Sequence, residues 1–107
     1  MLIPQPQVLA TDGSKQLVRY TTADAIWLEL IAHKEDGSGL RAVIHVHAPS
    51  RLVEHYVVRW ESSGEARREL LEEKTVTKAK LREILGRALR VRTFEDFFNL
   101  ALFIREA

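Results

Sequence analysis

Four histidines are the side chains in this chain whose type and spacing most suggest chemistry. They are His33, His45, His47 and His55, and all occupy odd positions within a stretch of alternating apolar residues. Side chains of a β-strand alternate between two faces, so odd positions of paired strands gather on one face. Imidazoles gathered in this way bind transition metals or exchange protons near neutral pH.

A metal site is one hypothesis for these histidines. If residues 49–51 form a three-residue turn, positions whose numbers sum to 100 are opposed, and His45 lies opposite His55. Opposed Cβ atoms are about 5 Å apart, which would let two imidazoles share zinc or non-haem iron. A four-residue turn would place Glu54 opposite His45 instead. The spacing His-x-His-x7-His corresponds to no common metal motif, so no metal or other cofactor is expected.

Three alternating runs, 24–34, 40–48 and 52–61, carry the histidines and predict strands. The even positions at 26–32, 40–48 and 52–60 are apolar except for Glu54, which predicts a core face that includes Trp60. Their odd positions mix aromatic, aliphatic and charged residues, a composition too apolar for ordinary solvated surface. We predict a binding face there, and its residues are Trp27, Glu29, His33, Arg41, Val43, His45, His47, His55, Val57 and Arg59.

The elements before these runs are shorter. Prolines at positions 4 and 6 predict an extended arm over 1–7, and Asp12-Gly13 predicts the turn of a small hairpin over 8–20. The segment 24–34 is ambiguous, because Thr22 could cap a helix there and Gly37 could end it. We interpret it as a strand, since the even positions from 26 to 32 then form a fully apolar face. Residues 8–61 are therefore mainly strands.

Residues 62–107 are predicted to be helical. Ser62 with Glu65 resembles a capping box for a helix over 65–74. A second helix should run to about Leu89, because apolar residues spaced i, i+3, i+4 and i+7 form one stripe along it. Thr93 should cap a third helix over 94–105, which we expect to be the central buried helix. The fold class predicted is α+β: an antiparallel β-meander of three to five strands, followed by two or three C-terminal helices packed on the even sheet face.

Composition narrows the class of protein. The chain has 107 residues, 46% of them hydrophobic, which is typical of one small domain with a core. It has no cysteine, so neither disulfides nor thiolate chemistry are available. The first seven residues lack the basic flank of a signal peptide, and no apolar run reaches the ~20 residues of a membrane helix. A cytoplasmic location without membrane contact is expected.

A basic segment, 74–92, suggests nucleic-acid binding as an alternative function. It contains seven lysines and arginines and a single acid, Glu83, between acidic flanking segments. Two features weaken this alternative. No aromatic residue lies among these cations to stack on bases. Glu83 is also three or four residues from some of them, a helical spacing that allows ion pairs within the segment.

No motif of a common catalytic site is recognisable. The sequence lacks a glycine-rich phosphate loop, a nucleophilic cysteine and a nucleophile elbow, so we do not expect an enzyme. We favour a small non-catalytic protein-interaction module, such as an adaptor, inhibitor or immunity-type accessory protein, that binds through the odd-numbered sheet face. Its partner would be another protein or a second copy of itself. Nucleic-acid binding through Lys74–Arg92 and a histidine metal site are the second and third hypotheses.

Overall fold

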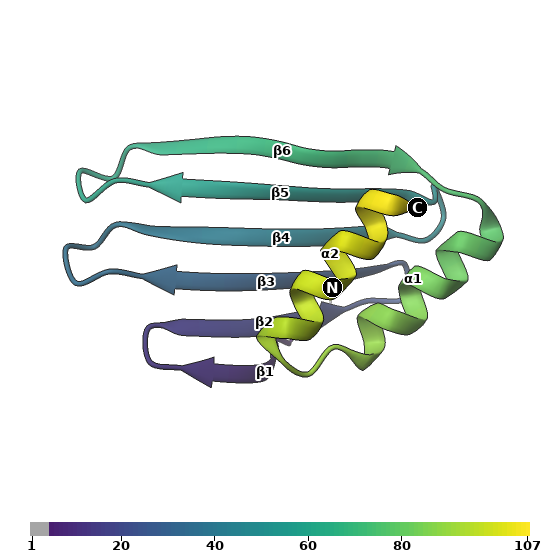
Figure 1. The fold of residues 1–107 in the computed structure, drawn as a ribbon, viewed down its shortest axis with the longest axis horizontal. Helices are drawn as coiled ribbons and strands as arrows, with labels where there is room; N and C mark the ends of the chain where they lie inside the picture. The colour runs from purple at the N-terminus through teal and green to yellow at the C-terminus, as the bar shows by residue number, and fades with distance from the viewer. Residues whose placement is uncertain (1–4) are drawn as a thin grey trace.

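The computed structural model describes residues 5–107 and shows a six-stranded antiparallel sheet with two helices on one face (Figure 1). The strands are β1 (Gln7–Asp12), β2 (Lys15–Thr21), β3 (Ala25–His33), β4 (Gly39–His47), β5 (Leu52–Trp60) and β6 (Ala66–Thr75), and the helices are α1 (Lys78–Arg90) and α2 (Phe94–Glu106). Each strand pairs with its neighbour in the chain, so the sheet is a meander. The α+β prediction is confirmed, but the sheet has six strands rather than three to five.

The additional strand is β6, where the sequence predicted a helix over 65–74. Gly64, at φ +92°, turns the chain, and the amide of Glu61 donates to the carbonyl of Glu65, which continues the ladder into β6. The predicted helix is wrong because this segment pairs along the whole of β5, and its backbone groups form hydrogen bonds across the strands instead of along a helix. Strand pairing outweighs the helical propensity of these residues, which amounts to tenths of a kcal/mol at each position.

Both helices after β6 begin at threonine caps, of which the sequence predicted the second, Thr93. Thr77 caps α1, and Thr93 forms a reciprocal capping box with Asp96 at the start of α2. Hydrogen bonds from the backbone amides of Arg92 and Thr93 lower the pKa of the Asp96 carboxyl. The predicted apolar stripe of α1 is buried against the sheet. However, α2 is not a central helix, because one side of it faces solvent.

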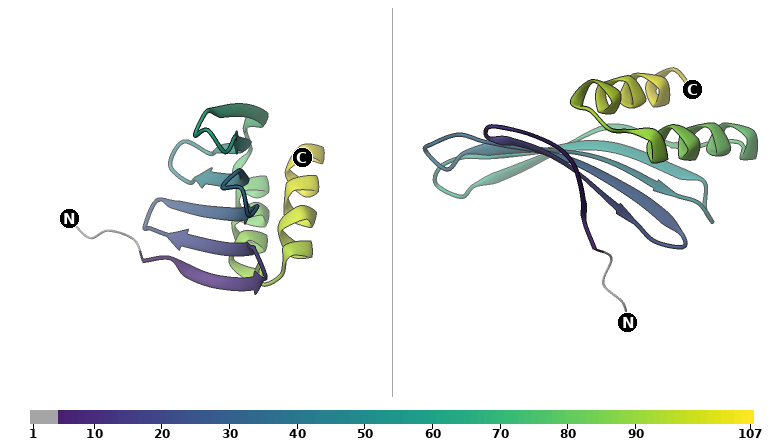
Figure 2. Two further views of the ribbon diagram at one scale, coloured as in Figure 1. Left: turned by 90° about the vertical axis from the view of Figure 1, so that its left-hand side faces the viewer. Right: turned by 90° about the horizontal axis from the view of Figure 1, so that it is seen from below.

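The sheet has two distinct faces (Figure 2). We call the face that packs against α1 and α2 the helix face, and the opposite face the open face. Leu17, Leu28 and Ile44 lie fully buried on the helix face, together with Phe97 from α2. No segment of residues 5–107 forms a second layer over the open face.

The turn between β4 and β5 decides which side chains share a face. It contains four residues, 48–51, and ends at Arg51 with a positive φ of 58°. His45 therefore pairs with Glu54, and even positions of β5 lie on the same face as odd positions of β4. The expected three-residue turn over 49–51 was therefore wrong. The connection holds a fourth residue because Arg51 adopts the left-handed conformation, which closes a longer turn.

This register corrects four placements. His55, Val57 and Arg59 lie on the helix face rather than beside His45, and Trp60 lies on the open face rather than in the core. The odd-with-odd pairing of β3 with β4 is confirmed, since Trp27 pairs with His45. The strand over 24–34 and the N-terminal hairpin are also confirmed as β3 and β1–β2. The predicted arm, 1–7, falls partly on residues 1–4, which lie outside the described residues.

An arginine joins the sheet to α1. The buried guanidinium of Arg19, on the helix-face side of β2, donates through Nη1 to the carbonyls of Ala88, Leu89 and Val91 at 3.0–3.3 Å. Its Nη2 donates to Oε1 of Gln7 at 3.0 Å. Carbonyls at a helix C-terminus carry partial negative charge, which makes a cation favourable there. Burial is the main cause that lowers the pKa of Arg19.

Candidate functional site

The centre of the open face holds a group of mutually contacting side chains. The indole Nε1 of Trp27 donates to Oε1 of Glu29 at 2.6 Å, along the same strand. Arg41, from β4, lies with its Nε 3.8 Å from the other carboxylate oxygen of Glu29. The Trp27 ring also lies 4.8 Å from the ring of His45 and 6.2 Å from the ring of Tyr56, centroid to centroid. Trp27 is therefore held by contacts on β3, β4 and β5.

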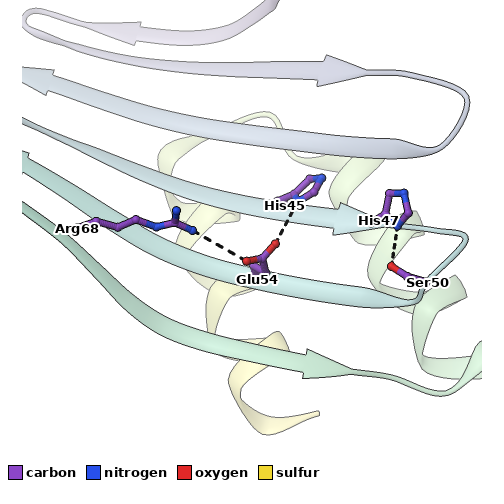
Figure 3. Close-up of polar contacts among 5 residues, drawn as sticks. All are labelled: His45, His47, Ser50, Glu54 and Arg68. Atoms are coloured by element: carbon purple, nitrogen blue, oxygen red, sulfur yellow. Dashed lines mark hydrogen bonds and ion pairs between the residues drawn. The ribbon is translucent and has the colours of Figure 1, made fainter.

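A second set of contacts continues toward β6. Nδ1 of His45 lies 3.4 Å from Oε1 of Glu54, and Nη2 of Arg68 lies 4.0 Å from Oε2 of the same carboxylate (Figure 3). The guanidinium of Arg68 lies over the Tyr56 ring at 4.0 Å from its centroid. We call these seven residues the open-face cluster: Trp27, Glu29, Arg41, His45, Glu54, Tyr56 and Arg68.

The cluster buries residues beneath it although no second layer covers it. Val43 is 0% exposed and Glu29 is 8% exposed, both on the open face. Burial also raises the pKa of the Tyr56 hydroxyl, an effect that the nearby Arg68 partly opposes. The side chains of the cluster thus exclude water from their own base, which is typical of a rigid, preorganised surface.

Most of the predicted face is found in one place. Trp27, Glu29, His33, Arg41, Val43, His45 and His47 share the open face, as predicted for β3 and β4. His47 lies at the end of β4, where Nδ1 is 2.6 Å from Oγ of Ser50 (Figure 3). At the opposite end, the ring of His33 lies 5.6 Å from that of Trp60, whose Nε1 donates to the Gly37 carbonyl at 2.9 Å.

Five open-face residues were not predicted: three on β5 because of the wrong β4–β5 register, one on β2 opposite Trp27, and one on β6, where a helix was expected. They are Tyr20, Glu54, Tyr56, Trp60 and Arg68. Glu54 was a usable signal, since it was the single acid among the even positions and fitted the four-residue turn. Nothing in the local pattern of 65–74 indicated that Arg68 would reach Tyr56.

The opposed histidines required by the metal hypothesis do not exist. His55 lies on the helix face, where its ring packs 6.3 Å from that of Phe97. Burial lowers the pKa of His55, and the neighbouring Glu72 acts more weakly in the opposite direction. Within residues 5–107, no group of three histidine, aspartate or glutamate side chains lies close enough to hold a metal ion.

Several cations of the predicted nucleic-acid segment have intramolecular contacts. Arg87 and Lys80 of α1 lie over the ring of Phe103 at 3.9 and 5.0 Å from its centroid. Lys80 also pairs with Glu83 at 3.7 Å. Nζ of Lys74 donates to two carbonyls at the end of α2. These contacts attach basic side chains to α2, so fewer of them extend freely into solvent.

Comparison with known proteins adds no relative: no family model matches the chain, and neither a curated protein nor a solved structure matches it significantly. In the part of the chain that the structure describes, no helix has the length and apolar character needed to cross a membrane.

Proposed function

We propose that this protein is a small non-catalytic protein-interaction module, of the adaptor, inhibitor or immunity-accessory kind, that binds another protein through its open sheet face. One observation carries the proposal: Trp27, with Glu29, His45 and Tyr56, is fixed by side-chain contacts on a face that no other described segment covers. A surface of this kind has the composition of an interface centre.

The contacts within the cluster favour recognition over catalysis. Each charged member faces an oppositely charged or aromatic member, and the cluster contains no serine or cysteine nucleophile. Side chains already held in one rotamer lose little entropy when a partner binds, so preorganisation supports affinity. Tryptophan, tyrosine and arginine are the residues that most often dominate interface energies.

The test compares two aromatic residues on opposite sides of the molecule, the half-buried Trp27 and the exposed Phe98. Proteins captured from host-cell lysate on the wild-type chain would be identified, purified and titrated against Trp27→Ala and Phe98→Ala by calorimetry. Sedimentation of the purified chain would measure self-association in parallel. We expect Trp27→Ala to weaken association about 30-fold, equivalent to roughly 2 kcal/mol, because an interface anchor is removed. Phe98→Ala, on α2, should leave affinity unchanged.

Two outcomes would contradict the proposal. In the first, Trp27→Ala binds as tightly as the wild type while Phe98→Ala does not. In the second, the purified chain binds duplex DNA tightly at physiological salt, and Lys80→Glu with Arg87→Glu abolishes that binding. Affinity that falls steeply with added salt would then support the nucleic-acid alternative through α1.

A further inference from the structure

The outward side of α2 exposes two large apolar side chains. Phe98 is 58% exposed, and Leu102, one turn later, is 48% exposed. No segment of residues 5–107 lies beyond them on the side of the helices away from the sheet (Figure 2). Large apolar side chains left in water along one helix are typical of a surface that binds another protein element.

A charged residue flanks this apolar pair at each end. Glu95 lies one turn before Phe98 and is exposed, and Arg105 is likewise exposed one turn after Leu102. We call these four residues the α2 stripe, because their spacing of i, i+3, i+7 and i+10 places them along one side of the helix, as at the seam of paired helices. Glu106 lies to one side of the stripe. Among residues 5–107, neither Glu95 nor Arg105 takes part in an ion pair.

A groove lies between the α2 stripe and β6. Its volume is about 410 Å³, and Leu71 of β6 lines it together with Phe98 and Leu102. Leu71 is itself 44% exposed. Glu72 also lines the groove, but its carboxylate lies 3.7 Å from Nζ of Lys74 and is therefore compensated within the chain. The groove adds apolar surface beside the stripe that a second helix would cover.

The α2 stripe is complementary to itself when two copies of α2 run antiparallel. With a two-fold axis beside position 100, Glu95 of one copy lies opposite Arg105 of the second copy. The same axis places Phe98 opposite Leu102, so the exposed apolar side chains cover each other. Each contact occurs twice, because both copies present the same surface. A parallel arrangement would instead oppose like charges at both ends, which is unfavourable.

From this charge complementarity we infer that α2 binds the α2 of a second copy of this chain, and that the protein forms an antiparallel homodimer through the α2 stripe. The inference goes beyond the proposed function and does not rest on it. The stripe lies on the helix side of the molecule, so the open face of each copy stays free (Figure 2). The homodimer therefore presents two open faces to partner proteins.

Two leucines of equal exposure serve as matched variants. Sedimentation of the full chain between about 10 µM and 1 mM measures the homodimer, for which an interface this small predicts a dissociation constant on the order of 100 µM. Leu102→Ala should weaken self-association about 30-fold, because each dimer loses two central apolar contacts. Leu89→Ala, on α1 and also 48% exposed, should leave self-association unchanged.

Charge reversal tests the antiparallel orientation. Glu95→Arg opposes two cations at each end of the dimer, and Arg105→Glu opposes two carboxylates. Each variant alone should therefore self-associate roughly tenfold more weakly than the wild type. An equimolar mixture of the two variants restores an ion pair at both ends and should form a dimer as stable as that of the wild type. Recovery in the mixture also shows that both variants are folded.

Three results would overturn the inference: a wild-type chain that stays monomeric at about 1 mM, equal losses in the two leucine variants, or charge variants that stay monomeric when mixed. Self-association that is lost in Trp27→Ala but kept in Leu102→Ala would also overturn it, since the open face would then form the homodimer. The proposed function is judged separately, by the affinity of Trp27→Ala for a captured partner protein.

Discussion

Val43 and Val46, three residues apart on β4, show how differently the two faces of one sheet achieve burial. Both are 0% exposed and point to opposite faces. Val46 is buried by the apolar core beneath the helices. Val43 does not belong to that core, and it is covered by the polar and aromatic side chains of neighbouring strands on the open face.

The comparison teaches that burial alone does not identify a core. On the helix face, apolar packing between layers excludes water, and each lost methyl group leaves a cavity. On the open face, a thin layer of hydrogen-bonded side chains excludes water, and it has solvent on its outer side. The first arrangement stabilises the fold, whereas the second holds a surface in one conformation.

The largest effect is expected at two adjacent residues of α2. Phe97 is 0% exposed on the helix-face side, and Phe98 is 58% exposed. Phe97→Ala should lower the free energy of unfolding by about 3–5 kcal/mol, because it leaves a large cavity in the core. Phe98→Ala should lower it by less than about 1 kcal/mol. Urea denaturation measures both, and similar losses would show that α2 does not pack on the sheet as described.

A smaller loss is expected from Arg19→Met. The substitution keeps an unbranched apolar stem but removes the donors for the carbonyls that end α1. We expect the free energy of unfolding to fall by about 2–3 kcal/mol, since buried carbonyls lose charged donors. Arg59→Met, at an exposed position of the helix face, serves as the control in the same denaturation series. If Arg19→Met leaves the free energy of unfolding unchanged, water replaces the guanidinium as the donor to these carbonyls with no loss of stability.

Matched valines test the comparison of the faces directly. Val46→Ala should lower the free energy of unfolding by about 2 kcal/mol, because the core cannot close over the missing methyl groups. Val43→Ala should lower it by about 1 kcal/mol, because solvent-facing side chains above it can move inward. If thermal unfolding shows Val43→Ala to be the more damaging, the open face is part of the stabilising core.

The smallest effect concerns pH. Burial lowers the pKa of His55 in the folded protein below its ordinary value of about 6.5. As pH falls through that value, the unfolded chain takes up the proton first, so the free energy of unfolding should decrease. His55→Phe should reduce this decrease between pH 7.5 and pH 5 in denaturant titrations. Identical pH profiles for wild type and His55→Phe would show that His55 titrates as it does in the unfolded chain.

Local patterns in the sequence determined much of this protein. The alternation of apolar residues in 24–34 and 40–48 predicted β3 and β4, because a strand that buries one face needs period two. Asp12-Gly13 predicted the first hairpin, and Thr93 with Asp96 predicted the start of α2, because turns and caps involve residues only a few positions apart. The β3–β4 part of the candidate site followed from the same alternation.

Only the tertiary structure decided the rest, because each remaining feature depends on distant residues. Residues 66–75 have helical propensity, yet β5 offers a free edge and the segment pairs with it as β6. A single left-handed residue, Arg51, sets the register that brings Glu54 rather than His55 to His45. The contact between Arg19 and the end of α1 spans about 70 residues of sequence. Such pairings are selected by the free energy of the whole fold. They cannot be predicted from a short stretch of sequence, because that free energy depends on contacts between distant residues.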